Sequence, residues 1–331
     1  MTIAKNYEDK MGYIQTERLI KLIKDNFEDA LGRELDLIRV SAPLFLKENS
    51  GLNDNLNGYE KPIAFKTSEI DETLEIVHSL AKWKRYALAK YGITSGGLYT
   101  DMNAIRKDEK VDALHSYYVD QWDFEMVINK EERNLETLKE VVRKIVHVLS
   151  QVEDKLHKEY KGLKKVVEEE VFFITSQELE DRYPNLSSEE RQDMIAKEHH
   201  SVCVLKIGKK LKSGKRHDGR APDYDDWELN GDILIYYPLL EKAVEIASLG
   251  IRVDKESLQR QLLEVGEERR LLLPYHQMIM QKKLPLTLGG GIGQSRVCLL
   301  LLNKTHIGEV QASIWPDETL KFDLENNLHL L

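Results

Sequence analysis

Hydrophobic residues along this chain follow two spacings, one typical of helices and one typical of strands. Apolar residues repeat at intervals of three and four over 14–31 and 132–160, which predicts two long helices. Gly32 follows the first of these and favours its end there. Further helical patterns cover 78–86 and 255–283. In the 78–86 segment, Lys82, Lys84 and Arg85 cannot share one helical face, so at least one must point inward or toward a cleft.

Shorter apolar runs, rich in β-branched and aromatic residues, predict strands. They cover 35–40, 74–77, 96–106, 115–125, 171–174, 201–207 and 231–237, and an extended pattern returns at 250–253. Strands and helices are mixed along the whole length, with no internal repeat and no long linker. We therefore predict a single α+β domain over residues 1–331.

The strand predicted at 115–125 alternates in an informative way. One face carries Tyr117, Val119, Gln121, Asp123 and Glu125, and the other carries Tyr118, Asp120, Trp122 and Phe124. An amide and two carboxylates therefore stand in a row on one face. This fits either an exposed face of a sheet or a face that lines a substrate site beside Arg106 of the preceding strand.

A glycine-rich segment, Thr287–Arg296, precedes the apolar run 297–302. The pattern predicts a helix that begins where the glycines end. The start of a helix offers unpaired N–H groups and favours phosphate, and Arg296 would add a planar positive charge. The alternative is a tight strand-to-helix junction that needs glycine only for packing.

Acidic residues suggest a cation site in the second half of the chain. Four carboxylates occur within nine residues, at Asp218, Asp223, Asp225 and Asp226, with Arg220 among them. Such a group is tolerated when it is exposed or when it faces cations such as an ammonium group or Mg²⁺. Asp232 and Glu245 lie on predicted neighbouring strands and can share a Mg²⁺ ion that carries phosphate oxygens. The chain lacks Gly-x-x-x-x-Gly-Lys-Ser/Thr, which argues against a P-loop.

Composition narrows the classes of partner. The chain has 331 residues and a net charge of -9, which is unfavourable for binding tRNA or DNA. Its two cysteines, Cys203 and Cys298, lie in apolar runs and are expected in the core. The N-terminus has no apolar signal segment, and no run reaches the length of a membrane span. We expect a cytoplasmic protein that binds neither nucleic acid nor membrane.

Several long motifs together resemble the ammonia-dependent asparagine synthetase (aspartate–ammonia ligase) family, a relative of the catalytic core of class II aminoacyl-tRNA synthetases. The resemblance covers nearly the whole chain. It rests on motifs at 54–58, 77–85, 97–100, 114–123, 176–179, 216–227, 229–234, 250–253 and 289–296. It implies a mixed, mainly antiparallel sheet flanked by helices. The segment between Trp227 and Leu229 is shorter than the family pattern leads us to expect.

The resemblance also implies a reaction. The β-carboxylate of aspartate attacks the α-phosphorus of ATP to give β-aspartyl-AMP and pyrophosphate, with Mg²⁺ present. Ammonia then attacks the acyl carbon and gives asparagine and AMP. A homodimer is implied as well, because the family's first motif, which ends here at Pro43, lies at a dimer interface.

Roles for individual residues follow from the resemblance. Aspartate binding falls to Ser79, Lys84, Gln121, Asp123, Ser248 and Arg252. ATP binding falls to Arg106, His115, Ser116, Asp232, Gly291, Gly293 and Arg296, and metal binding to Asp232 and Glu245. Asp54 and Asp225 would face the reacting end, where a carboxylate can attract ammonium and take its proton. Arg106 and Arg296 would also act in catalysis by stabilising phosphate charge.

Two other functions compete with this one. The first is an aspartyl- or asparaginyl-tRNA synthetase core, against which stand the acidic charge and the absence of an anticodon-binding barrel before the first predicted helix. The second is a non-catalytic paralogue that senses an amino acid. That function predicts loss of charged site residues, yet Arg106, Arg296, Asp232 and Glu245 are all present.

Overall fold

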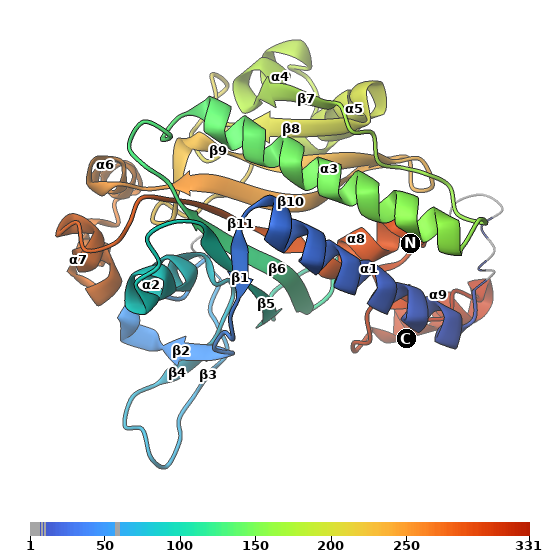
Figure 1. The fold of residues 1–331 in the computed structure, drawn as a ribbon, viewed down its shortest axis with the longest axis horizontal. Helices are drawn as coiled ribbons and strands as arrows, with labels where there is room; N and C mark the ends of the chain where they lie inside the picture. Colours follow the sequence, from blue (N-terminus) through green and yellow to red (C-terminus); the bar gives the residue numbers. More distant parts are fainter. Residues whose placement is uncertain (1–6, 8, 10, 57–59) are drawn as a thin grey trace.

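A large mixed sheet runs through the centre of the structure, a computed structural model that describes residues 7, 9, 11–56 and 60–331 (Figure 1). Asn57 and Gly58 of the 54–58 motif lie outside the described residues. The eight strands of this sheet within the described residues follow the order β1-β5-β6-β11-β10-β9-β8-β7. Only the outer pairs, β1–β5 and β7–β8, are parallel. This is the mainly antiparallel α+β sheet that the sequence predicted.

Strands β1, β5, β6, β7 and β8 agree with the predicted segments to within a few residues, whereas β9 starts six residues early, β10 was predicted only at its end, and β11 was not predicted. Their bounds are Leu37–Arg39 (β1), Gly97–Ile105 (β5), Tyr118–Val127 (β6), Val171–Thr175 (β7), Ser201–Leu205 (β8), Asp225–Tyr237 (β9), Lys242–Arg252 (β10) and Thr287–Gly293 (β11). Because β9 is continuous from Asp225 to Tyr237, the short segment around Trp227 and Leu229 is part of the sheet.

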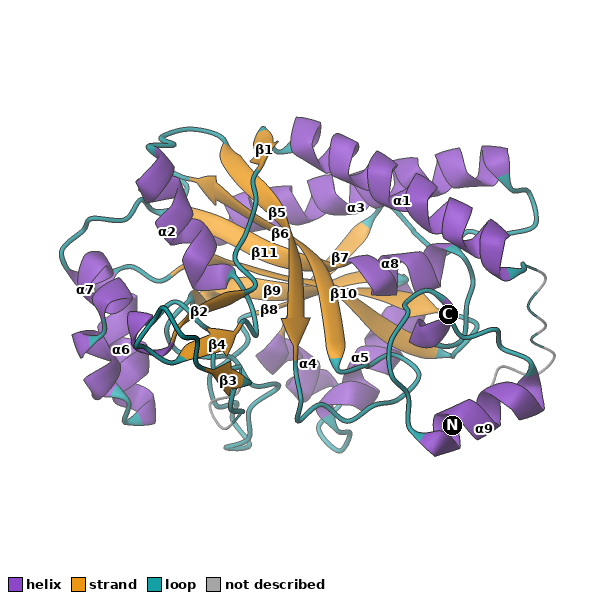
Figure 2. Cartoon of the chain, turned by 90° about the horizontal axis from the view of Figure 1, so that it is seen from below, coloured by secondary structure: helices purple, strands orange, loops and turns teal. Residues whose placement is uncertain are grey.

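Two long helices, α1 (Tyr13–Glu34) and α3 (Leu135–Glu159), lie side by side along one face of the main sheet (Figure 2). Both agree with the periodic segments predicted from sequence, but α1 continues through Gly32 to Glu34, so the predicted end at Gly32 was wrong. Their apolar stripes bury residues such as Phe27 against Trp122 of β6, whose rings stack with centroids 4.3 Å apart. This layer holds the largest hydrophobic core. The other face of β6 is thereby left for polar side chains.

A smaller unit lies beside the open face of the main sheet (Figure 2). It contains a three-stranded sheet of β2 (Phe45–Lys47), β4 (Leu74–Ile76) and β3 (Ala64–Phe65), and it packs near helix α2 (Ala81–Tyr91). Trp83 and Leu88 of α2 join a second hydrophobic cluster with Leu98 and Met102 of β5. This packing fixes the position of α2 over the open face.

Shorter helices pack around the two sheets. They are η1 (Glu48–Ser50), α4 (Ser176–Arg182), α5 (Ser188–His199), α6 (Lys255–Val265), η2 (Glu268–Leu272), α7 (Pro274–Met280), α8 (Gln294–Leu301), η3 (Ile307–Glu309) and α9 (Asp317–Asn326). The continuous helical pattern predicted over 255–283 was wrong, because Gly266 ends α6 at a φ of 72° and Pro274 starts a separate helix.

The glycine-rich segment forms strand β11 and runs directly into α8. Neighbouring strands pair with β11 on both sides, so its backbone belongs to the sheet ladder. At the start of α8, the N–H of Ser295 donates to Asp120 Oδ1 at 3.1 Å. The predicted helix that begins where the glycines end is confirmed, and the glycines themselves form the strand of a strand-to-helix junction. Phosphate binding at this helix start stays a prediction.

Both cysteines are fully buried, as predicted. Among the described helices, none combines the length and the apolar character that crossing a bilayer requires.

Candidate active site

A cleft of about 370 Å³ lies over the face of the main sheet that α1 and α3 leave free. Its walls come from β6, β9, β10 and β11, from α2, from the start of α8, and from the loops beside them, including the one after β5. The structure brings all the predicted site residues together in this cleft: Asp54, Ser79, Lys84, Arg106, His115, Ser116, Gln121, Asp123, Asp225, Asp232, Glu245, Ser248, Arg252, Gly291, Gly293 and Arg296. The role of each one remains a prediction.

Lys84 is a fully buried cation at one end of the cleft. Its Nζ donates to Asp123 Oδ1 and to the carbonyl of Gly290, both at 2.7 Å. Burial lowers the pKa of Lys84, and the attraction of Asp123 opposes this shift. The second oxygen of Asp123, Oδ2, is buried and has no hydrogen-bond partner within the described residues. This oxygen can therefore accept a hydrogen bond from a cationic ligand.

Arg252 is held between two carboxylates at the same end. Its Nε and Nη2 donate to Glu125 at 3.0 and 2.8 Å, and its Nη1 donates to Asp225. Burial alone lowers the pKa of Arg252, but Glu125 and Asp225 outweigh burial and hold that pKa above its usual range. The guanidinium group therefore stays charged and fixed in orientation.

The glycines of β11 leave space for these side chains. A Cβ atom at Gly289 would lie 2.0 Å from Glu125 Oε2, and a Cβ atom at Gly291 would lie 2.6 Å from Gln121 Oε1. Real Cβ atoms do not approach other atoms so closely. The glycines are thus required where long polar side chains of β6 cross the neighbouring strand.

The loop before β3 adds Asp54 beside α2. Its Oδ2 accepts a hydrogen bond from Ser79 Oγ at 3.0 Å, and its Oδ1 accepts one from the N–H of Leu56 at 3.1 Å. The side chain makes no ion pair with any residue that the structure describes. Asp54 is buried, and among the described residues a hydroxyl and one amide donate to its carboxylate at the cleft wall.

The four clustered carboxylates of the 218–226 segment go to different places. Asp223 pairs with Lys82 at 3.0 Å and with His276 at 2.8 Å, and Asp226 pairs with Arg133 at 2.7 Å. Both are buried pairs outside the cleft lining. Asp225 pairs with Arg252, which leaves Asp218 as the exposed member.

Lys82, Lys84 and Arg85 of α2 are all buried, in agreement with the prediction that they cannot share one solvated face.

Arg106 and Arg296 lie toward the other end of the cleft. Arg106 Nη2 has one long contact, 3.5 Å to the carbonyl of His78, and its Nε has no hydrogen-bond partner within the described residues. Arg296 Nη1 donates to the carbonyl of Glu245 at 2.8 Å, and 25% of its side chain is exposed. Both guanidinium groups keep N–H capacity for an anion.

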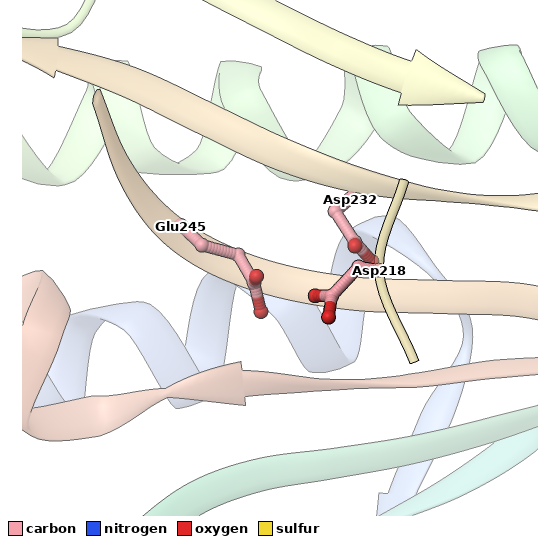
Figure 3. A group of neighbouring side chains, drawn as sticks. All are labelled: Asp218, Asp232 and Glu245. Atoms are coloured by element: carbon pink, nitrogen blue, oxygen red, sulfur yellow. The ribbon is translucent and has the colours of Figure 1, made fainter. Parts of the chain in front are cut away.

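Three acids approach one another at this end (Figure 3). Asp232 of β9, Glu245 of β10 and Asp218 each offer an oxygen, and these oxygens lie within 4.8 Å of one another. Burial in the cleft, followed by the like charge of Asp232, raises the pKa of Glu245 to about 7. Oxygen donors crowded in this way fit a hard divalent cation such as Mg²⁺. Asp232 also accepts from Arg220 Nη2 at 2.6 Å, while Arg220 Nη1 donates to Ser248.

Ser116 belongs to a buried hydrogen-bond network at the same end. Its hydroxyl contacts Gln311 Oε1, and Gln311 Nε2 donates to Ser295 Oγ at 3.0 Å. Asp120 accepts from Ser295 and from Lys24 Nζ at 3.2 Å. His115 lies at the rim, where its Nδ1 is 2.8 Å from Asp112 Oδ1.

Sequence reasoning missed several residues of this cleft. Asp218 was part of a conspicuous acidic segment, but its approach to Asp232 and Glu245 depends on how the chain folds back. Glu125 was on the correct face of its strand, yet nothing in the sequence identified Arg252 as its partner. Gln311 lies in a segment with no recognisable motif. For Glu125, a signal was present in Gly289, since a glycine opposite a long side chain indicates reserved space.

The arrangement has two chemical ends joined in one cleft. One end offers a fixed arginine, a buried lysine and a carboxylate oxygen without a partner, which suits a zwitterionic amino acid. The other end offers two arginines and an acidic cluster, which suits a metal-bound phosphate chain.

Comparison with known sequences agrees with this chemistry. A sequence profile of the aspartate-ammonia ligase family matches residues 14–327. An aspartate–ammonia ligase of Clostridium perfringens is 56% identical over 99% of this chain and 98% of its own length. Aspartate–ammonia ligases of Ligilactobacillus salivarius and Fusobacterium nucleatum are 55% and 56% identical, over 100% and 98% of this chain and 99% of their own lengths.

Solved structures with a similar fold are more distant in sequence. The asparaginyl-tRNA synthetase of Entamoeba histolytica in complex with asparaginyl-adenylate has a TM-score of 0.65 at 15% identity, over 90% of this chain and 66% of that chain. That of Pyrococcus horikoshii, also complexed with asparaginyl-adenylate, has a TM-score of 0.65 at 15% identity, over 91% of this chain and 70% of that chain. These likenesses establish a class II synthetase-like fold, and the full-length match establishes that the chain belongs to the aspartate–ammonia ligase family.

Proposed function

We propose that this protein converts L-aspartate and ammonia to L-asparagine, consuming ATP and releasing AMP and pyrophosphate. The observation that carries the proposal is the joining of an amino-acid end and a phosphate end in one cleft. The full-length match to aspartate–ammonia ligases supports the same reaction.

The amino-acid end would orient aspartate by its α-substituents. Arg252 would bind the α-carboxylate, and Asp123 would accept a hydrogen bond from the α-ammonium group through Oδ2. Lys84 keeps Asp123 in place by a buried ion pair. Gln121, Ser79 and Ser248 add neutral hydrogen-bonding groups around the ligand. The β-carboxylate would then point along the cleft toward the arginines.

Adenylate formation would take place between Arg106 and Arg296. A β-carboxylate oxygen bonds to the α-phosphorus as the bond to pyrophosphate breaks, and negative charge grows on the phosphate oxygens. Arg106 has spare N–H groups at this point, so it would stabilise that charge. His115 and Ser116 would contact the adenine base, with Gly291 and Gly293 beneath the nucleotide. Asp232 and Glu245, with Asp218 beside them, would hold Mg²⁺, which neutralises phosphate charge when bound.

The ammonia step needs a carboxylate near the acyl carbon. Nitrogen bonds to this carbon, AMP leaves with the electrons of the acyl–oxygen bond, and a proton passes from nitrogen to a base. Asp54 accepts only neutral hydrogen bonds from its described neighbours, so it would serve as this base. Asp225 is engaged with Arg252 and would instead keep that arginine in position.

We also propose a cytoplasmic homodimer formed through the segment that ends at Pro43. Ile38, Leu44 and Phe45 surround this segment and are 57%, 49% and 44% exposed. Large apolar side chains grouped on a surface favour a protein interface. Size-exclusion chromatography with light scattering tests the dimer, and a monomer at micromolar concentration would contradict it.

The reaction is tested by incubating the purified protein with aspartate, ATP, Mg²⁺ and ¹⁵N-labelled ammonium. We expect ¹⁵N-asparagine with an equal amount of AMP. Formation of ADP would refute the adenylate route. Aspartyl- or asparaginyl-tRNA in a parallel reaction with tRNA, without free asparagine, would favour a synthetase instead. Binding of aspartate without any product would favour an amino-acid sensor.

A further inference from the structure

Glu125 is a completely buried carboxylate that does not line the cleft. It lies on β6 two residues beyond Asp123, on the same face of the strand. Its two oxygens accept hydrogen bonds from Arg252 at 2.8 to 3.1 Å. Since Glu125 cannot touch a ligand in the cleft, any role that it has in recognition must act through Arg252.

The contacts to Arg252 determine which of its N–H groups remain free. A guanidinium group has five N–H donors, one on Nε and two on each terminal nitrogen. Glu125 engages Nε and one donor of Nη2, and Asp225 engages one donor of Nη1. One N–H on each terminal nitrogen is left without a partner among the described residues. These two donors can hydrogen-bond to the oxygens of a carboxylate ligand.

Glycines on the neighbouring strands leave space for the contact between Glu125 and Arg252. A side chain on Gly289 of β11 would collide with Glu125, and a Cβ atom at Gly250 of β10 would lie 2.6 Å from the carboxyl carbon of Asp225. Glycine at both positions therefore leaves the space in which the two carboxylates hold one guanidinium group. If Glu125 were absent, only Asp225 would hold Arg252, from one side, and the plane of the group would no longer be fixed.

We propose that Glu125 is a positioning residue for amino-acid recognition. It fixes the guanidinium plane of Arg252 so that the two free N–H groups face the α-carboxylate of the substrate. This inference rests on the proposed function, in which Arg252 binds that carboxylate. The affinity for the α-carboxylate would then depend on a side chain that lies behind the cleft wall and does not itself contact the ligand.

The test compares Glu125→Gln with the wild type for two ligands. L-Aspartate carries the α-carboxylate, and L-isoasparagine replaces it with an amide while keeping the β-carboxylate that reacts. ATP–pyrophosphate exchange gives KM for each, and calorimetry gives binding of each without ATP. We expect Glu125→Gln to raise the KM for aspartate about tenfold to a hundredfold, because it weakens a charge-assisted contact. The KM for ATP should stay within about twofold, and isoasparagine should show little further loss.

A purely structural role would lower activity equally for both ligands, and that result would overturn the proposal. An unchanged KM for aspartate would overturn it too. Glu180→Gln is the matched control, because Glu180 is a buried carboxylate that contacts Arg191 at 3.4 Å away from the cleft. We expect this control to leave both KM values unchanged.

Two further measurements keep the outcome decisive. If Glu125→Gln does not fold, Glu125→Asp keeps the charge and shortens the reach, and it should still weaken aspartate more than isoasparagine; equal weakening would overturn the proposal. A wild type that binds aspartate but forms no asparagine would refute the proposed reaction alone. Calorimetry of the variant would then decide the role of Glu125 by the same criterion.

Discussion

The two ends of the cleft differ in how completely their charges are paired. At the amino-acid end, Lys84, Asp123, Glu125 and Arg252 are buried and bonded to one another or to Asp225. At the phosphate end, Arg296 and Glu245 remain 25% and 36% exposed, and Arg106 makes one long hydrogen bond to the part of the chain that the structure describes. One end is therefore organised before any ligand arrives, whereas the other needs the charges of a ligand to complete it. In the proposed function, selectivity for the amino acid would therefore rest on contacts that already exist, and stabilisation of phosphate charge on contacts that the ligand completes.

The largest expected difference between the ends is in folding stability. Arg252→Ala leaves Glu125 and Asp225 buried without their partner, which should lower the free energy of unfolding by about 3–5 kcal/mol. Arg296→Ala should lower it by less than about 1 kcal/mol, because this side chain is partly solvated. Urea unfolding followed by circular dichroism measures both. Equal losses would mean that the two ends are organised alike.

For catalysis we expect the larger effect at the phosphate end of the cleft. Arg106→Ala should reduce ATP–pyrophosphate exchange by about 10²–10³, because a donor to the developing phosphate charge is removed. The free energy of unfolding should change little, since Arg106 has few contacts to lose. Exchange at the wild-type rate would refute its role in adenylate formation.

A fall in pH should destabilise the folded structure first near the phosphate end of the cleft. His306 is buried before η3, where its Nδ1 accepts from the N–H of Gly308 at 3.0 Å, and burial lowers its pKa from 6.5 to about 4. Between these values the unfolded chain binds a proton that the folded protein does not. Stability is therefore lost as the pH falls from about 6.5 to 4, by up to about 3 kcal/mol.

Amide hydrogen exchange at pH 5 locates this loss. It should rise in residues 303–312 before it rises in β6, because His306 lies next to the cleft-lining Ile307. His306→Asn keeps an acceptor for Gly308 and should flatten the pH dependence. A wild-type profile in this variant would show that another group titrates.

The smallest expected effect is at the loop that carries Asp54. Ser79→Ala removes the hydrogen bond that the Ser79 hydroxyl donates to the Asp54 carboxylate, worth about 1.5 kcal/mol, and should raise the KM for aspartate about tenfold. Ser79→Thr keeps the hydroxyl and should restore most of the affinity. No change in the alanine variant would mean that the backbone alone orders Asp54.

How far sequence could predict this molecule depended on whether a feature is local. The helices at α1 and α3 and the two faces of β6 follow from periodicity, because core packing imposes the spacing directly on neighbouring residues. The broken 255–283 region was missed, since a hydrophobic pattern continues across Gly266 while the backbone turns. The glycines of β11 were not predicted as a strand, because glycine marks close approach without indicating what approaches.

The resemblance to a family named the candidate site residues one by one. It did not predict which charged side chains pair with one another. The contact of Glu125 with Arg252 and that of Lys82 with Asp223 join segments far apart in the chain. Only the register of β6, β11 and β10 brings the first pair together. No spacing within one segment carries this information.

Strand β11 also sets a limit on how this enzyme can be redesigned. Because its central residues are glycines, this part of the cleft floor has no side chains to exchange, and new ligand preferences would have to come from the side chains of β6 and β10 on either side. A methyl group at position 289 would require a shorter residue at 125 and relief from the carbonyl of Phe124, 2.6 Å away. A change of ligand specificity at this part of the cleft therefore requires substitutions on several strands at once.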